Sequence, residues 1–146
     1  MLFMKDINYI IIRVFAKPED DSEIIEKALI NLLPKETKFN KKKASSFKER
    51  TIIVYEANIE KQKLIKEFLK KIFTNLNSEQ KELLIKQIEY RLNENKFNIR
   101  LEKKDLIQNK HFITNYGDCF NIIIGLANFP DKTVEERVKD LIDNFK

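Results

Sequence analysis

The sequence has little of several residue types that mark common kinds of functional site. It holds two glycines, three prolines, one cysteine, one histidine and no tryptophan among 146 residues. Two glycines exclude a glycine-rich phosphate-binding loop, and a single histidine leaves no pair for a zinc site and no evident proton relay. Cys119 has no partner for an internal disulfide, which fits a reducing compartment. We therefore expect a protein that is not an enzyme and that uses no cofactor and no metal.

Long apolar runs are missing as well. The longest apolar stretches have only the length of a strand, so no membrane span is predicted, and the N-terminus does not have the pattern of a signal peptide. Hydrophobic residues make up 42% and charged residues 35% of the chain. This balance is typical of a globular protein. We predict a single domain over residues 1–146 and a cytoplasmic location.

Apolar spacing predicts four strands and four helices. The strands alternate with period two or are rich in β-branched residues, and the helices carry one apolar stripe each. Strands are predicted over Ile7–Ala16, Thr51–Ala57, Phe97–Leu101 and Cys119–Phe129. Helices are predicted from the Pro18–Ser22 segment to Leu33, over Glu60–Leu76, from Asn77 to about Asn95, and after a cap at Asp131 or Thr133. The fold class is α+β, in the order β-α-β-α-α-β-β-α: a mostly antiparallel four-stranded sheet with helices on one face.

The other face of this sheet is expected to be partly open. The first strand turns Ile10, Ile12, Val14 and Ala16 to one side. Its opposite side and the matching side of the strand Phe97–Leu101 together carry aromatic, amide and basic groups: Tyr9, Arg13, Phe15, Asn98 and Arg100. Such a mixture is typical of sheets that bind unpaired RNA. Ile11 and Ile123 share this side, however, and also suit a face covered by a helix or by a second subunit.

The segment Lys35–Arg50 shows no clear period and is predicted to be a long basic loop. It contains seven basic and two acidic residues, an excess that equals the net charge of +5 of the whole chain. Lysine and arginine side chains on one segment can neutralise RNA phosphates, although a solvated loop without a partner has the same composition. The RNA-contacting residues predicted here are Lys38, Lys41, Lys42, Lys43, Lys48 and Arg50.

A second basic cluster is expected at one end of the sheet. It comprises Arg100, Lys103, Lys104, Lys110 and His111, and we include its first three members, Arg100, Lys103 and Lys104, among the predicted RNA contacts. The acidic run Glu19–Asp21 has the composition of a metal ligand set, but acidic residues at a helix start are mostly caps. Cys119 is interpreted as a structural thiol.

Two segments carry a resemblance to a known family. The run Ile12–Asp20, followed by Ile24, Ile25, Ala28, Leu29 and Asn31–Leu33, resembles the opening of an archaeal family of predicted exosome subunits or RNA-binding proteins. Ile99–Lys104 stands where that family has an Arg-Leu-Asp-Lys segment. The resemblance implies a fold like that of the large-subunit ribosomal protein that binds 5S rRNA.

These patterns together predict an RNA-binding accessory protein, in RNA processing or associated with the exosome. RNA is the expected partner, and the protein partners of such a complex are expected as well. No association with a membrane is expected. The alternative is a protein-interaction module or homodimer that uses the open sheet face. A metal-dependent nuclease would require the acidic run at residues 19–21 to bind metal.

Overall fold

The structure is a computed structural model that describes residues 6–45, 50–115, 117–128 and 132–145. Its helices and strands follow one another along the chain as β1 (Ile7–Ala16), α1 (Ser22–Leu32), β2 (Phe39–Ser45), β3 (Thr51–Ile59), α2 (Gln62–Asn75), α3 (Ser78–Lys86), α4 (Ile88–Arg91), β4 (Leu92–Asn93), β5 (Lys96–Glu102), α5 (Lys103–Ile107), β6 (Cys119–Leu126) and α6 (Val134–Asn144). No helix in these ranges is long and apolar enough to cross a membrane.

The strands form one antiparallel sheet in the order β2-β3-β1-β6-β5-β4. The α+β class and the antiparallel sheet are confirmed, but the sheet has six strands, so the prediction of four is wrong. The two strands that sequence analysis missed lie at the two edges. β4 has only two residues, and β2 has the sequence FNKKKAS, without apolar alternation.

The interpretation of Lys35–Arg50 as an irregular loop is wrong over Phe39–Ser45. Each residue of β2 pairs with β3, from Phe39 opposite Ala57 to Ser45 opposite Thr51. An edge strand needs no apolar pattern of its own when its neighbour supplies the hydrogen bonds, and lysines on an edge discourage pairing with another chain. The three consecutive lysines Lys41, Lys42 and Lys43 are therefore carried on a strand with fixed alternation.

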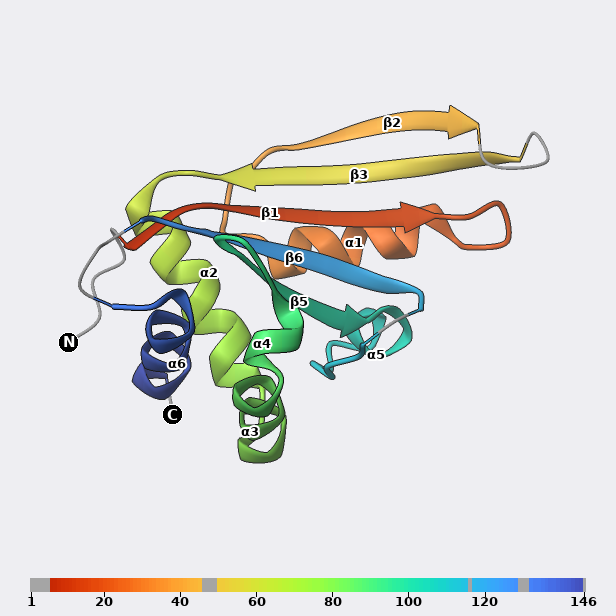
Figure 1. Ribbon diagram of the computed structural model, residues 1–146. Coiled ribbons are helices and arrows are strands. Elements are labelled where there is room, and N and C mark those ends of the chain that lie inside the picture. The colour runs from red at the N-terminus through yellow and green to blue at the C-terminus, as the bar shows by residue number, and fades with distance from the viewer. Residues whose placement is uncertain (1–5, 46–49, 116, 129–131, 146) are drawn as a thin grey trace.

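The helices cover one face of the sheet. In Figure 1 the sheet runs along the top and the helices lie below it. On β1 the side chains of Ile10, Ile12 and Val14 point to the helices and are fully buried, while Ile11 and Arg13 between them are partly exposed. The predicted arrangement, with helices on one face and the other face open, is confirmed.

Most predicted elements are present, with two changes between residues 77 and 115. The single helix predicted from Asn77 to about Asn95 is divided into α3, α4 and β4, because the regular helix ends at Gln87. A short helix that sequence analysis did not predict, α5, directly follows β5. Helix caps are provided by Asp21, Asn77 and Thr133, whose side chains accept hydrogen bonds from backbone amides, whereas Asp131 lies outside the described residues.

Candidate nucleic-acid interface

The sheet face opposite the helices, here called the open face, is built from the outward positions of the strands. Residues directly opposite one another in antiparallel strands share a face. The register therefore joins five strands in one row across the open face: Asn40, Glu56, Arg13, Asn121 and Arg100. A second row beside it consists of Asn58, Ile11, Ile123 and Asn98. The open face thus has many amide groups, which can donate and accept hydrogen bonds to base edges and ribose hydroxyls.

Only one cation of the open face has a carboxylate partner among the described residues. The Arg13 guanidinium donates to Glu56 Oε1 through Nε at 3.0 Å and Nη2 at 2.5 Å. Arg100 Nη1 donates instead to the backbone oxygen of Asn115 at 2.9 Å. Lys42 and Lys96 point to the same side and take part in none of the ion pairs found in the described ranges. Positive charge available to a ligand therefore lies at the two margins of the open face.

Apolar side chains occupy the middle of the open face. Phe15 is 43% exposed, and Ile11 and Ile123 face each other across β1 and β6. The Tyr9 ring lies directly on Gly125, where an added Cβ would be 2.3 Å from the ring. The Phe15 ring thus has the exposure that base stacking requires, while the Tyr9 ring is only partly exposed. The two isoleucines have the character of a protein interface.

Alternation along β2 divides the three consecutive lysines between the two sides of the sheet. Lys41 and Lys43 lie opposite Tyr55 and Ile53 and share their helix-covered side, while Lys42 lies opposite Val54 on the open face. Lys41 Nζ is 3.4 Å from Glu26 of α1 and 5.7 Å from the centroid of the Tyr55 ring. Tyr55 and, after it, Glu26 raise the pKa of Lys41. The three lysines therefore do not form one cluster.

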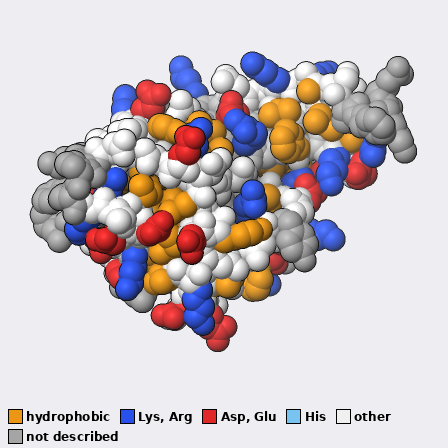
Figure 2. Space-filling model, in the orientation of Figure 1, with side chains coloured by type: hydrophobic (Ala, Val, Ile, Leu, Met, Phe, Trp, Pro, Cys, Tyr) orange, Lys and Arg blue, Asp and Glu red, His pale blue; other side chains and the backbone are white. Residues whose placement is uncertain are grey.

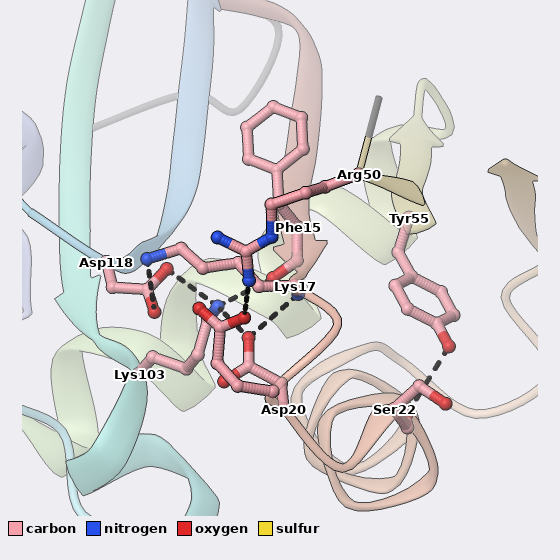
Figure 3. Close-up of polar contacts among 9 residues, drawn as sticks. Phe15, Lys17, Asp20, Ser22, Arg50, Tyr55, Lys103 and Asp118 are labelled. Atoms are coloured by element: carbon pink, nitrogen blue, oxygen red, sulfur yellow. Dashed lines mark hydrogen bonds and ion pairs between the residues drawn. The ribbon is translucent and has the colours of Figure 1, made fainter. Parts of the chain in front are cut away.

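Lys103, predicted as an RNA contact, is buried at the start of α5 and holds several elements together (Figure 3). Its ammonium donates to the Phe15 oxygen at 2.6 Å, to Asp118 Oδ1 at 2.7 Å and to Asp20 Oδ2 at 3.3 Å. Lys17 Nζ lies 3.4 Å from the other oxygen of Asp118. With only 4% of its side chain exposed, Lys103 has the contacts of a structural cation. It connects α5 to β1, to the connection between β1 and α1, and to the residue that precedes β6.

The acidic run at residues 19–21 has structural partners. Glu19 pairs with Arg50, Asp21 caps α1, and Asp20 accepts from Lys103 and from the Lys17 amide at 2.9 Å. Partial burial acts to raise the pKa of Asp20, but the amide hydrogen bond and the Lys103 charge lower it below its ordinary value. Within the described ranges no group of three or more histidine, cysteine, aspartate or glutamate side chains is arranged to hold a metal ion.

The remaining predicted contacts are spread over the molecule. Lys38 and Lys104 are exposed, Arg50 is paired with Glu19, and Lys48 lies outside the described residues. The strands that carry Lys42 and Arg100 are separated by β3, β1 and β6. The two predicted basic regions therefore lie at opposite margins of one sheet. In Figure 2, lysine and arginine side chains are mixed with acidic ones and form no continuous basic area in that view.

His111 and Cys119 do not have the surroundings of reactive groups. His111 is buried, and neither ring nitrogen has a hydrogen-bond partner among the described residues. Burial and, after it, the Lys71 charge lower the pKa of His111, so the imidazole is neutral at pH 7. Burial raises the pKa of the Cys119 thiol, although the nearby Arg100 charge acts against that increase. A thiol with a raised pKa is a poor nucleophile.

Sequence analysis missed Arg91, the last residue of α4. It follows Leu84 and Ile88 at the spacing of the buried helix stripe and is 3% exposed. A charged residue at an inward helical position is the signal that would have drawn attention to it. Its guanidinium lies near that of Arg100, since both donate to Asn115.

The fold and the open face define a class of protein: an antiparallel sheet with helices on one side and an uncovered, amide-rich face on the other. A family model described as RNA binding matches residues 9–126. This chain belongs to that RNA-binding family. A search of curated proteins found no match.

Solved structures of archaeal proteins share the fold. A DUF54 protein from Archaeoglobus fulgidus is 23% identical, with 96% of this chain and 99% of that chain covered and a TM-score of 0.80. A DUF54 protein from Methanothermobacter thermautotrophicus is 19% identical, with coverage of 93% and 98% and a TM-score of 0.77. A UPF0201 protein from Methanococcus jannaschii is 18% identical, with coverage of 92% and 98% and a TM-score of 0.59. At these identities the similarity is one of fold.

Proposed function

We propose that this protein binds RNA across the open face of the sheet and acts as a non-catalytic accessory protein in RNA processing. The observation that carries the proposal is the uncovered face itself, whose two central rows present amide groups beside the exposed ring of Phe15 and the partly exposed ring of Tyr9. Membership of the RNA-binding family supports RNA as the ligand. Association with the exosome is the finer form of the proposal, and the resemblance in sequence supports it.

The dimensions of the open face suit a short stretch of unpaired RNA. From β2 to β5 the sheet spans four strand spacings, which is about 19 Å. Lys42 lies at one margin, and Lys96 and Arg100 lie at the other. Phosphates at the margins would meet these cations, while bases between them would lie over Phe15, Tyr9 and the asparagines. A duplex cannot present its bases in this way, because they are stacked and paired.

Lys42 and Lys43 provide a matched pair of variants for testing this proposal. They are neighbours in β2, both are exposed, and they lie on opposite sides of the sheet. Fluorescence anisotropy with a labelled single-stranded RNA at several salt concentrations would give affinities for the wild type, Lys42→Gln and Lys43→Gln. We expect Lys42→Gln to weaken binding and to reduce the slope of log affinity against log salt concentration by about one. Lys43→Gln should leave both the affinity and this slope unchanged. Equal effects of the two variants, or no binding by the wild type at low salt, would contradict the proposal.

A homodimer through the open face is the second candidate function. Phe15 is 43% exposed, and Ile11 and Ile123 add apolar area beside it, as in surfaces that bind protein. Sedimentation at increasing concentration would show a dimer that Phe15→Ser weakens. A molecule that stays monomeric at the highest concentration would exclude this candidate and leave the open face to RNA.

A further inference from the structure

A recess lies beside the outward side of β5, where α4 passes into β4. Its volume is about 290 Å³, close to the lower limit of roughly 300 Å³ for small-molecule pockets. It is lined by residues of these three elements: Tyr90, Arg91, Leu92, Asn93, Asn98 and Arg100. The lining thus combines two guanidinium groups, two amides and one tyrosine ring in a space that suits one nucleotide.

Arg91, in the wall of this recess, has no carboxylate partner among the described residues. Its guanidinium donates to Gln87 Oε1 at 2.7 and 3.1 Å, to Asn115 Oδ1 at 2.5 Å and to backbone oxygens at 3.4 and 3.5 Å. All of these acceptors are neutral. They hold the side chain in place without balancing its charge, and Arg91 is only 3% exposed to water. A buried cation without a counter-ion is expensive, so an anion in the recess would be stabilised.

Arg100 adds a second positive charge at the same place. Its Nη1 donates to the Asn115 backbone oxygen at 2.9 Å, while Arg91 donates to the Asn115 side chain. Burial lowers the pKa of Arg91, and the Arg100 charge lowers it further. Two like charges fixed near one another repel, and a phosphate that both can approach would relieve the repulsion.

Tyr90 adds an aromatic surface beside the two guanidinium groups. It lines the recess and is 64% exposed, so most of its ring is available to a base. Stacking on an aromatic ring is tolerant of base identity but requires a base that is not already paired and stacked. Asn93 and Asn98 in the lining can add hydrogen bonds to base edges or ribose hydroxyls.

We propose that this recess binds one unpaired nucleotide, with its phosphate directed to Arg91 and Arg100 and its base stacked on Tyr90. The inference rests on the proposed RNA binding by the open face and adds the ligand subsite at the β5 margin. A subsite of this kind would make the protein selective for single-stranded RNA or for an RNA end.

Tyr90→Ala and Arg100→Gln test the subsite, with exposed residues elsewhere as matched controls. Phe112→Ala removes an aromatic ring that is 52% exposed and does not line the recess, and Lys139→Gln removes one charge on α6. The assay is anisotropy with a single-stranded octanucleotide and with a duplex of the same length, after thermal unfolding has shown that each variant is folded. Tyr90 carries little buried area, so Tyr90→Ala remains informative even if Arg100→Gln destabilises the protein.

We expect Tyr90→Ala to weaken binding of the single strand by roughly 5- to 100-fold, as when one stacked base is lost, without changing binding of the duplex. Arg100→Gln should weaken single-strand binding by about tenfold, and the two controls should bind as the wild type. In NMR titrations, adenosine 5′-monophosphate should shift the signals of residues 90–93 more than adenosine or inorganic phosphate does.

If the wild type binds the single strand and Tyr90→Ala binds equally well, the nucleotide subsite is wrong while the proposed RNA binding stands. Equal shifts with inorganic phosphate and with the nucleotide would reduce the recess to a phosphate site and overturn the stacking. If the wild type binds neither RNA at low salt, the proposed function itself fails.

Discussion

Replacing the buried Lys103 by methionine should destabilise the protein strongly. The substitution keeps an unbranched side chain as far as Cε but removes the ammonium group. It leaves the Phe15 oxygen without its donor and two carboxylates, Asp20 and Asp118, without the ammonium they share. Breaking a buried ion pair from one side costs about 3–5 kcal/mol. Asp20 and Asp118 keep 22% and 37% of their side-chain surface, so water screens part of this loss, and we expect about 2–3 kcal/mol.

Lys104 provides the control for this prediction, because it is the next residue and is exposed. Lys104→Met should change the free energy of unfolding by less than about 0.5 kcal/mol. For a chain of this size, Lys103→Met should lower the Tm by roughly 6–12 °C, measured by circular dichroism at pH 7. A Tm for Lys103→Met within 2 °C of that of Lys104→Met would refute the structural role of the buried ammonium.

The ion pair between Lys103 and Asp20 also predicts how the destabilisation by Lys103→Met depends on pH. The pKa of Asp20 is lowered in the folded state from an ordinary value of 3.8. The carboxylate therefore contributes stability that is complete above pH 3.8 and is lost as the pH falls through its folded pKa. The gap in stability between the wild type and Lys103→Met should narrow in that acidic window. If the difference in stability between the two proteins stays constant down to pH 2.5, the charge interaction is not the cause of the destabilisation.

Two further predictions concern the sheet and the core. Gly125→Ala places a Cβ 2.3 Å from the Tyr9 ring and should lower the free energy of unfolding in urea by about 1–3 kcal/mol. Adding Tyr9→Ala to this variant should recover much of that loss. If the effects of the two substitutions on the free energy of unfolding are strictly additive, the contact does not account for the loss. Because His111 is buried with a lowered pKa, the unfolded chain takes up its proton first, and stability should decline as the pH falls from about 6.5. His111→Phe should flatten that decline between pH 6.5 and 5, and an unchanged slope would assign it to other groups.

The elements that pack against the core could be predicted from the sequence. β1, α2 and β6 each bury one side at a regular period, and that period is visible in the chain. Edge strand β2 has no such period, because its stability comes from β3 and not from a buried face of its own. Local patterning cannot show a pairing that depends on another strand.

The candidate site was predictable to the extent that it follows alternation. The outward positions of Arg13 and Arg100 follow from the period of their strands. The same alternation sends Lys41 and Lys43 to one side of β2 and Lys42 to the other, an arrangement that the interpretation of this segment as a loop does not predict. The burial of Lys103 and Arg91 depends on acceptors far away in the sequence, Asp118 and Asn115 among them. Composition alone gives no sign of such contacts.

The most direct test of the central claim compares isoleucine methyl groups on the two sides of the sheet. Ile11 and Ile123 lie on the open face, and their sequence neighbours Ile12 and Ile122 are fully buried against the helices. In methyl NMR spectra of the 13C-labelled protein titrated with a single-stranded RNA, we expect the signals of Ile11 and Ile123 to shift most and those of Ile12 and Ile122 to shift little. Shifts confined to helix-side methyls, such as those of the exposed Ile24 and Ile30 on α1, would place the RNA elsewhere and contradict the account.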